Sequence, residues 1–457
     1  MKYFKNMFIF YTTFVINFLL NFVFIKLLTN YLDQSDLGRF FFASNLGLFA
    51  GGLFLLGFPL TFQRYIPQYL RDENYLKIHT LIQVPAILHF LAGMIITIPV
   101  LLIGGTTVAL VFFAFYSVNT LTLYQTAYIS MGKIVEYTMV TSPRLFLVAL
   151  LTFTFRRELS LVNLGLLNIF SNMLFLIVCF RSSPISFRGW REVLSEVKEY
   201  WNYSALNQIL SPFFFYIDSI LIPIFLPFSQ LSLFQISRKL DMAARQTLEI
   251  PLQLTAPLIS FKKTDELLTK DFAMKYRAFR TFYFYLALLW FLLFQFGGKV
   301  IIKIISNSEY ISALPYLVSL SFTLLISSIY APDAMLARST GNIKLFFYKD
   351  IVYISTFLIS FFILTPQIGL PGVSLSFMAA TILTAVYHIQ NFKVLHHLEY
   401  IFDGIRLFLF GVQAIIFLTS ANLLITFFII ITLILIDLKN LKNSYKIFKE
   451  QLRGKVI

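Results

Sequence analysis

Long apolar segments follow one another along the whole chain, separated by short polar stretches. The first, Met7–Thr29, is interrupted by a single basic residue, Lys26. An apolar helix of about 20 residues spans the hydrocarbon core of a bilayer. This segment is longer than the core of a secretory signal and has no small-residue cleavage site after it, so we interpret it as a retained first span. The pattern predicts an all-α polytopic membrane protein.

We expect about 14 transmembrane helices from this pattern. They are Met7–Tyr31, Phe40–Arg64, Thr80–Gly104, Thr107–Met131, Tyr137–Phe155, Leu159–Phe180, Tyr203–Leu226, Leu231–Leu258, Phe279–Ile305, Tyr310–Ala337, Phe347–Pro366, Gly372–Phe392, Ile405–Thr419 and Leu423–Ile436. The eighth carries several charges and is the least apolar. The stretches Arg181–Trp201 and Phe261–Arg280 resemble amphipathic connectors that lie on the membrane surface.

Charged residues fix the expected orientation of these helices. Only 13% of residues are charged, yet the net charge is +15. If the N-terminus is inside, most of the 37 Lys and Arg residues fall on the inner side, including the basic tail that follows Ile436. The positive-inside rule then places both termini in the cytoplasm. The charge therefore predicts contact with anionic lipids and no nucleic-acid partner, and the single Cys179 allows no internal disulfide.

Weak internal similarity predicts a duplicated architecture. Leu32–Phe40 and Leu226–Phe234 share Leu, Ser, Leu and Phe at matching positions, and Gly132-Lys133-Ile134 resembles Gly341-Asn342-Ile343. Transporters are often built from repeated halves. We expect a six-helix bundle over residues 1–199, a second over 200–400, and two further helices with a basic cytoplasmic tail over 401–457.

Short motifs in this order resemble the polysaccharide-transporter branch of the multidrug/oligosaccharidyl-lipid/polysaccharide (MOP) exporters, the Wzx-type flippases. The motifs are Leu28–Leu32 with Asp36-Leu37-Gly38, Gly57-Phe58-Pro59 with Arg64–Pro67, and Tyr216–Ser219. The resemblance implies two six-helix bundles in a V and alternating-access export of undecaprenyl-pyrophosphate-linked O-antigen or capsule repeat units. It also implies an ion gradient as energy source, and a polysaccharide polymerase and chain-length regulator as partners. Phe234–Ser237 departs from it, because a tyrosine is expected there.

The eighth helix carries the densest candidate site. Arg238, Asp241, Arg245 and Glu249 fall at helical angles of about 0°, 300°, 340° and 20°, so they share one face. Either this face lines a cavity where the arginines meet a pyrophosphate, or Asp241–Arg245 and Arg245–Glu249 pair along the helix. We place substrate binding at Arg238 and Arg245, and ion coupling at Asp241 and Glu249.

Other charges within spans are weaker candidates. Asp218 either binds a coupling ion or pairs with Arg238, which lies at the same depth on the adjacent helix. Lys26, Arg64 and Arg144 are further candidates for substrate binding. For each, the alternative is an interface anchor whose long side chain extends toward the head groups.

Three other functions compete with the flippase. A polymerase or ligase of the same pathway would need a large outer loop, and none is expected, so we do not expect an enzyme. A drug antiporter of the same superfamily suits an acidic cavity better than one with several buried arginines. A peptidoglycan-precursor flippase fits the span count equally well. The chain has no Walker motif, and we expect no cofactor and no bound metal.

Overall fold

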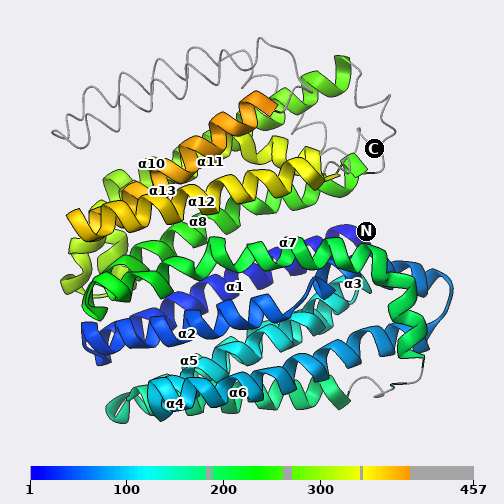
Figure 1. The fold of residues 1–457 in the computed structure, drawn as a ribbon, viewed down its shortest axis with the longest axis horizontal. Helices are drawn as coiled ribbons and strands as arrows, with labels where there is room; N and C mark the ends of the chain where they lie inside the picture. The colour runs from blue at the N-terminus through cyan, green and yellow to red at the C-terminus, as the bar shows by residue number, and fades with distance from the viewer. Residues whose placement is uncertain (1, 182–186, 188, 261–269, 340–342, 392–457) are drawn as a thin grey trace. The chain divides into compact units, whose positions relative to one another are not determined.

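The computed structural model describes the chain except residues 1, 182–186, 188, 261–269, 340–342 and 392–457 (Figure 1). Over this part it is all-helical, without a strand. The helices are α1 (Lys2–Tyr31), α2 (Gln34–Phe54), α3 (Phe58–Arg71), α4 (Tyr75–Ser130), α5 (Ile134–Thr154), α6 (Leu161–Arg181), α7 (Trp190–Phe225), α8 (Phe228–Ser260), α10 (Lys270–Ile305), α11 (Leu314–Ser339), α12 (Ile343–Ile368) and α13 (Leu370–Asn391), with 3₁₀ turns η1 (Arg156–Glu158) and η2 (Ser308–Ala313).

The apolar segments form helices of membrane-spanning length, which confirms the main expectation. Ten helical segments of the described chain are long and apolar enough to cross a bilayer. The helix expected over Leu231–Leu258 forms as α8, although its charges keep it out of that set. The two spans expected over Ile405–Thr419 and Leu423–Ile436 lie outside the described residues. The chain is therefore a multi-pass membrane protein.

The second expected span is not one helix, and this corrects the prediction. Leu56 and Gly57 both adopt positive φ angles, 47° and 76°, which end α2 and start α3 in a new direction. Glycine is required at 57 because a Cβ there would lie 2.4 Å from the backbone nitrogen of Ala205. Arg64 therefore lies on α3, a short amphipathic helix, and not at the end of a straight span.

The third and fourth spans form as expected and meet without a loop. Helix α4 runs for 56 residues, but Gly105 within it has φ 74° and ψ 174°, outside the helical region. Glycine tolerates this conformation because it has no Cβ. The two expected connectors lie partly outside the described residues, and their described ends form the starts of α7 at Trp190 and of α10 at Lys270. Their position at the membrane surface stays a prediction.

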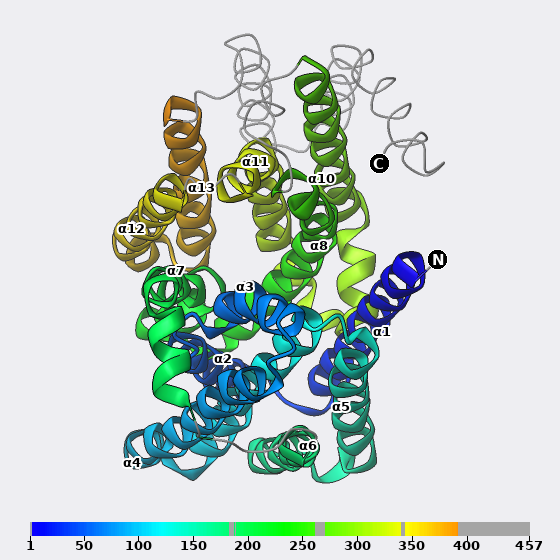
Figure 2. The same cartoon turned by 90° about the vertical axis from the view of Figure 1, so that its right-hand side faces the viewer.

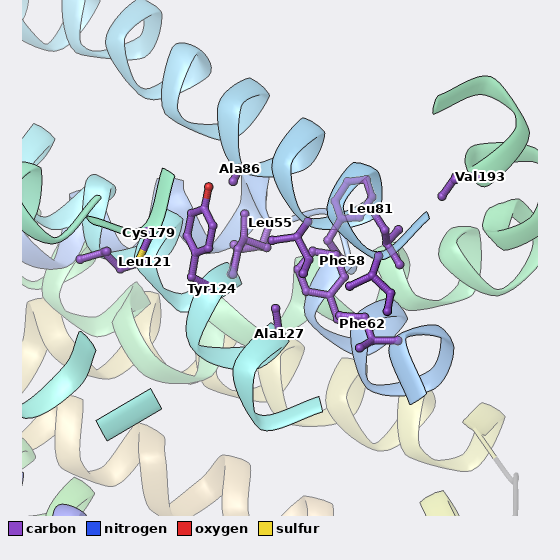
Figure 3. Packing of buried hydrophobic residues seen from close by; sticks show 14 of the residues in the cluster. Leu55, Phe58, Phe62, Leu81, Ala86, Leu121, Tyr124, Ala127, Cys179 and Val193 are labelled. Carbon is purple, nitrogen blue, oxygen red and sulfur yellow. The ribbon is translucent and has the colours of Figure 1, made fainter. Parts of the chain in front are cut away.

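A compact apolar core ties α3 to its neighbours (Figure 3). Phe62 and Ile66 of α3 are fully buried and belong to one cluster with Leu81 and Leu121 of α4, and Cys179 of α6 joins it. Close packing of this kind fixes neighbouring helices against one another. It holds α3 firmly although the helix has only 14 residues.

The chain divides into two compact units. Unit 1 contains residues 1–236 and 302–312, and unit 2 contains residues 237–301 and those from 313 onward. Within unit 1, α4 packs against α2, α5 and α6; within unit 2, α12 and α13 lie side by side in both views (Figures 1 and 2). The two units are defined by contacts between helices and not by repeated structure. The duplication, with its second half expected to begin at residue 200, therefore stays a prediction.

Candidate functional site

The charged face of α8 is organised around one buried carboxylate. Asp241 Oδ2 accepts hydrogen bonds from Arg238 Nη1 at 2.9 Å and from Arg245 Nε at 2.8 Å. The side chain of Asp241 is fully buried and that of Arg238 is 5% exposed. Two guanidinium groups share one carboxylate, so this trio carries a net positive charge. The expected Asp241–Arg245 pair along the helix is confirmed.

Arg245 extends from α8 toward α11. Its Nη2 donates to Thr323 Oγ1 at 2.7 Å and its Nη1 to Ser327 Oγ at 3.5 Å. The side chain keeps 27% of its surface exposed, so part of the guanidinium remains accessible. The expected Arg245–Glu249 pair is wrong: Glu249 is exposed, and the two side chains form no ion pair in the described structure.

Arg238 is held differently. Its guanidinium lies over the ring of Phe377 of α13, 4.7 Å from the centroid. A cation over an aromatic face is stabilised electrostatically. Arg238 is therefore fixed by both Asp241 and Phe377, and the more exposed Arg245 is the better placed of the two to meet a ligand.

Asp218 lies in a buried polar network of unit 1 that joins α2, α7 and α8. Gln235 Nε2 donates to Ser219 Oγ at 2.7 Å and to Asp218 Oδ2 at 3.4 Å. Asn45 of α2 donates to Ser219 Oγ at 2.9 Å. Gln235 stands in the segment where the sequence departs from the flippase pattern, and it serves this network. The expected Asp218–Arg238 pair joins residues of different units and stays a prediction.

Arg144 is buried within unit 1. It is 9% exposed, and its Nη1 donates to Asn172 Oδ1 of α6 at 3.0 Å. Asn172 in turn donates to the carbonyl of Ala114 and to Ser117 Oγ of α4. The side chain thus turns into the α4–α5–α6 packing, which excludes the interface anchor considered from the sequence.

Lys26 binds backbone and not a charged group. Its ammonium donates to the carbonyl oxygens of Ser306 and of Lys303, the latter at 3.2 Å. These carbonyls end α10, where unpaired acceptors remain. Asn307 reinforces the contact by donating to the Thr29 carbonyl at 2.7 Å. This contact explains the presence of a lysine at position 26 without any bound substrate. The predicted role of Lys26 in substrate binding stays untested.

Arg64 is exposed on the polar face of α3. Its guanidinium lies 4.4 Å from the ring centroid of Tyr200 in α7. Next to it, Glu196 of α7 accepts a hydrogen bond from Tyr69 at 2.7 Å and pairs with Lys77 of α4. Burial, together with the Glu196 hydrogen bond, raises the pKa of the Tyr69 hydroxyl, which therefore stays a donor. These contacts anchor α3 and leave Arg64 accessible.

Sequence reasoning missed a second charged cluster in unit 2. Asp333 of α11 accepts from Tyr276 of α10 at 2.7 Å and pairs with Arg280 Nε at 3.2 Å, while His388 of α13 lies 3.8 Å away. Arg280 is only 8% exposed, although its position suggested a connector residue. The signal was present: Tyr276 and Arg280 are four residues apart, on one face of the helix that becomes α10.

Known structures share this architecture. No family model matches the sequence, and no curated protein matches it significantly. The lipid II flippase MurJ in an inward closed conformation matches with a TM-score of 0.62 and 13% identity, over 98% of this chain and 99% of that one. An inward-facing MATE multidrug transporter of the MOP superfamily matches with a TM-score of 0.61 and 13% identity, over 86% and 95%.

The fold is that of the MOP transporters. A eukaryotic MATE transporter, AtDTX14, has the same fold, with a TM-score of 0.55 and 16% identity over 84% of this chain and 94% of that one. All three relatives are transporters. At these identities the likeness establishes the fold of the chain.

Proposed function

We propose that this protein is a MOP-type flippase that moves an undecaprenyl-pyrophosphate-linked oligosaccharide, an O-antigen or capsule repeat unit, across the bacterial inner membrane. The observation that carries the proposal is the pair of arginines around Asp241 on α8. Arg245 keeps part of its side chain accessible beside this carboxylate, and a guanidinium matches phosphate oxygens in charge and geometry. In this proposal Arg245 contacts the pyrophosphate and Arg238 positions Asp241. Arg64 and Arg144 are further candidates for the path of the anion.

The same charge argues against the drug antiporter. A cationic drug would have to lie beside the accessible guanidinium of Arg245, and like charges in a low dielectric repel strongly. The peptidoglycan-precursor flippase remains the second candidate. A lipid II flippase matches this fold over nearly the whole of both chains, and lipid II shares the lipid-pyrophosphate chemistry.

Ion coupling belongs to the same proposal. Asp218 is 1% exposed and accepts hydrogen bonds from the neutral donors Gln235 and Ser219. Burial disfavours the charged form of a carboxylate, so a buried aspartate gains from binding a proton or Na⁺. Asp241 is already neutralised by its arginines, and Glu249 is exposed, so Asp218 is the strongest of the three predicted coupling residues. A polysaccharide polymerase and a chain-length regulator are the proposed partners.

The test is complementation in two bacterial strains, one lacking its repeat-unit flippase and one depleted of its lipid II flippase. The wild-type chain should restore surface polysaccharide in the first strain and leave growth of the second unrestored. Rescue of the second strain alone would assign lipid II as cargo. Rescue of neither, together with raised resistance to cationic dyes, would support the antiporter.

Variants of Arg245 test whether polysaccharide export depends on the charged face of α8. Arg245→Gln should abolish polysaccharide export at unchanged membrane abundance, and Arg245→Lys should retain part of it, because charge and donor geometry both contribute. Arg39→Gln is the matched control, since that arginine is exposed and forms a loose pair with Asp36 at 3.5 Å. Normal export by Arg245→Gln would refute a role for this residue in binding.

A further inference from the structure

Arg144 is a buried cation in unit 1 for which the described chain provides no counter-charge. It occupies the middle of α5, ten residues from either end of a helix that spans Ile134–Thr154. At 1.5 Å per residue this is about 15 Å from both ends, too far for the guanidinium to reach either interface. A charge at this depth is costly unless something neutralises it.

The hydrogen bonds of Arg144 leave most of its donors unused. A guanidinium carries five N–H groups. Within the described residues, the Arg144 side chain donates one hydrogen bond, from Nη1 to Asn172 Oδ1, and forms no ion pair. Nε is enclosed and has no hydrogen-bond partner. The amide of Asn172 cannot rotate to do more, because its nitrogen is engaged by Ala114 and Ser117.

The surroundings of Arg144 differ from those of the other buried arginines. Arg238 has Asp241 at 2.9 Å, and Arg280 has Asp333 at 3.2 Å. Around Arg144 the polar groups are neutral: Asn172 and Ser171, the latter donating to the Arg144 carbonyl at 3.3 Å. A neutral amide orients a guanidinium but does not cancel its charge.

We propose that the Arg144 guanidinium, held in place by Asn172, binds a small inorganic anion of the size of chloride, which neutralises it between α4, α5 and α6. Arg144 keeps 9% of its surface exposed, so the residue is not completely enclosed. An anion that binds only the folded state raises its stability with concentration. A chloride site at Arg144 replaces the place in the cargo path considered for this residue above. The flippase proposal itself depends on Arg245, so the two proposals can fail separately.

The experiment is thermal unfolding of the purified full chain in detergent, followed by tryptophan fluorescence. Sodium chloride is titrated against sodium gluconate at constant ionic strength. Above the dissociation constant, each tenfold rise in chloride should raise the Tm by about 3 °C. Line broadening of chlorine-35 in NMR provides a direct binding measurement on the same sample.

Two variants make the result specific. Arg144→Met should remove both the Tm response and the line broadening. Asn172→Asp places a carboxylate beside the guanidinium, so its Tm in gluconate should rise to that of the wild type in chloride and then stay flat. Arg156→Gln changes an arginine in the exposed outer turn of the same unit and should keep the full response.

Three outcomes would overturn the proposal. The first is an equal wild-type Tm in chloride and gluconate with no line broadening. The second is a chloride response that persists in Asn172→Asp, which would place the anion elsewhere. The third is stabilisation by phosphate-headed lipids but not by chloride, which would assign Arg144 to the path of a lipid-linked cargo.

Discussion

Replacing Asp241 by Asn should destabilise unit 2 strongly. The substitution keeps the shape of the side chain but leaves Arg238 and Arg245 without their shared counter-charge. Breaking a buried ion pair from one side costs about 3–5 kcal/mol. Arg238 is 5% exposed and contributes fully, whereas Arg245 at 27% exposure is partly screened. We therefore expect the free energy of unfolding to fall by about 3 kcal/mol, near the lower limit of this range, which corresponds to a Tm lowered by about 6–12 °C.

The assay is unfolding monitored by the fluorescence of Trp290, whose Nε1 donates to Thr247 Oγ1 at 2.7 Å and so reports on the contact of α10 with α8. A double variant, Asp241→Asn with Arg238→Met, removes the most deeply buried charge as well and should be more stable than Asp241→Asn alone. The surface pair Asp36–Arg39 is the control, and Asp36→Asn should change stability by less than about 0.5 kcal/mol. A loss below about 1 kcal/mol for Asp241→Asn, or additive losses in the double variant, would refute the reasoning.

Three further predictions concern packing and topology. Gly38→Ala should lower the free energy of unfolding by more than about 2 kcal/mol, since its Cβ would lie 1.9 Å from the Phe228 carbonyl oxygen. In the same unfolding assay Gly297→Ala should be neutral or stabilising, because its Cβ would meet only ordinary contacts. Lys26→Met should lower stability by about 1–2 kcal/mol through the loss of its two hydrogen bonds to α10 carbonyls, and unchanged unfolding would contradict the capping role. Reporter fusions after Lys270 and Lys455 should be active in the cytoplasm, and periplasmic activity at either site would reverse the assigned orientation.

The helices were predictable because the hydrophobic pattern and the length of an apolar segment largely determine whether it spans a bilayer as a helix. Apolar length does not show where a backbone breaks, however. The end of α2 depends on Leu56 and Gly57 entering positive φ, and Gly57 is needed because the backbone of Ala205 packs against it. That contact joins residues almost 150 positions apart, so no local pattern in the sequence contains it. Helix α3 was therefore merged with the span before it.

The charged face of α8 was predictable from spacing alone, since residues three and four apart on a helix must be neighbours. Its partners on other helices were not. Thr323, Phe377 and Asn172 are ordinary residues in apolar segments, and only the packing of α11, α13 and α6 brings them to an arginine. Likewise, nothing in the sequence near Arg144 distinguishes a buried guanidinium from one that extends to the interface. The difference arises from which face of α5 meets α6.

The contact between Lys26 and the end of α10 has a consequence for how this protein can evolve. Lysine binds two main-chain oxygens there, so the identities of residues 303 and 306 do not decide whether the bonds form. A substitution that is accepted at either position therefore needs no compensating change at Lys26. Methods that infer spatial proximity from correlated substitutions would therefore miss this contact. Deep mutational scanning should instead reveal an asymmetric pattern: intolerance at Lys26 and wide tolerance at the exposed Lys303, with Ser306 limited only by the burial of its own side chain.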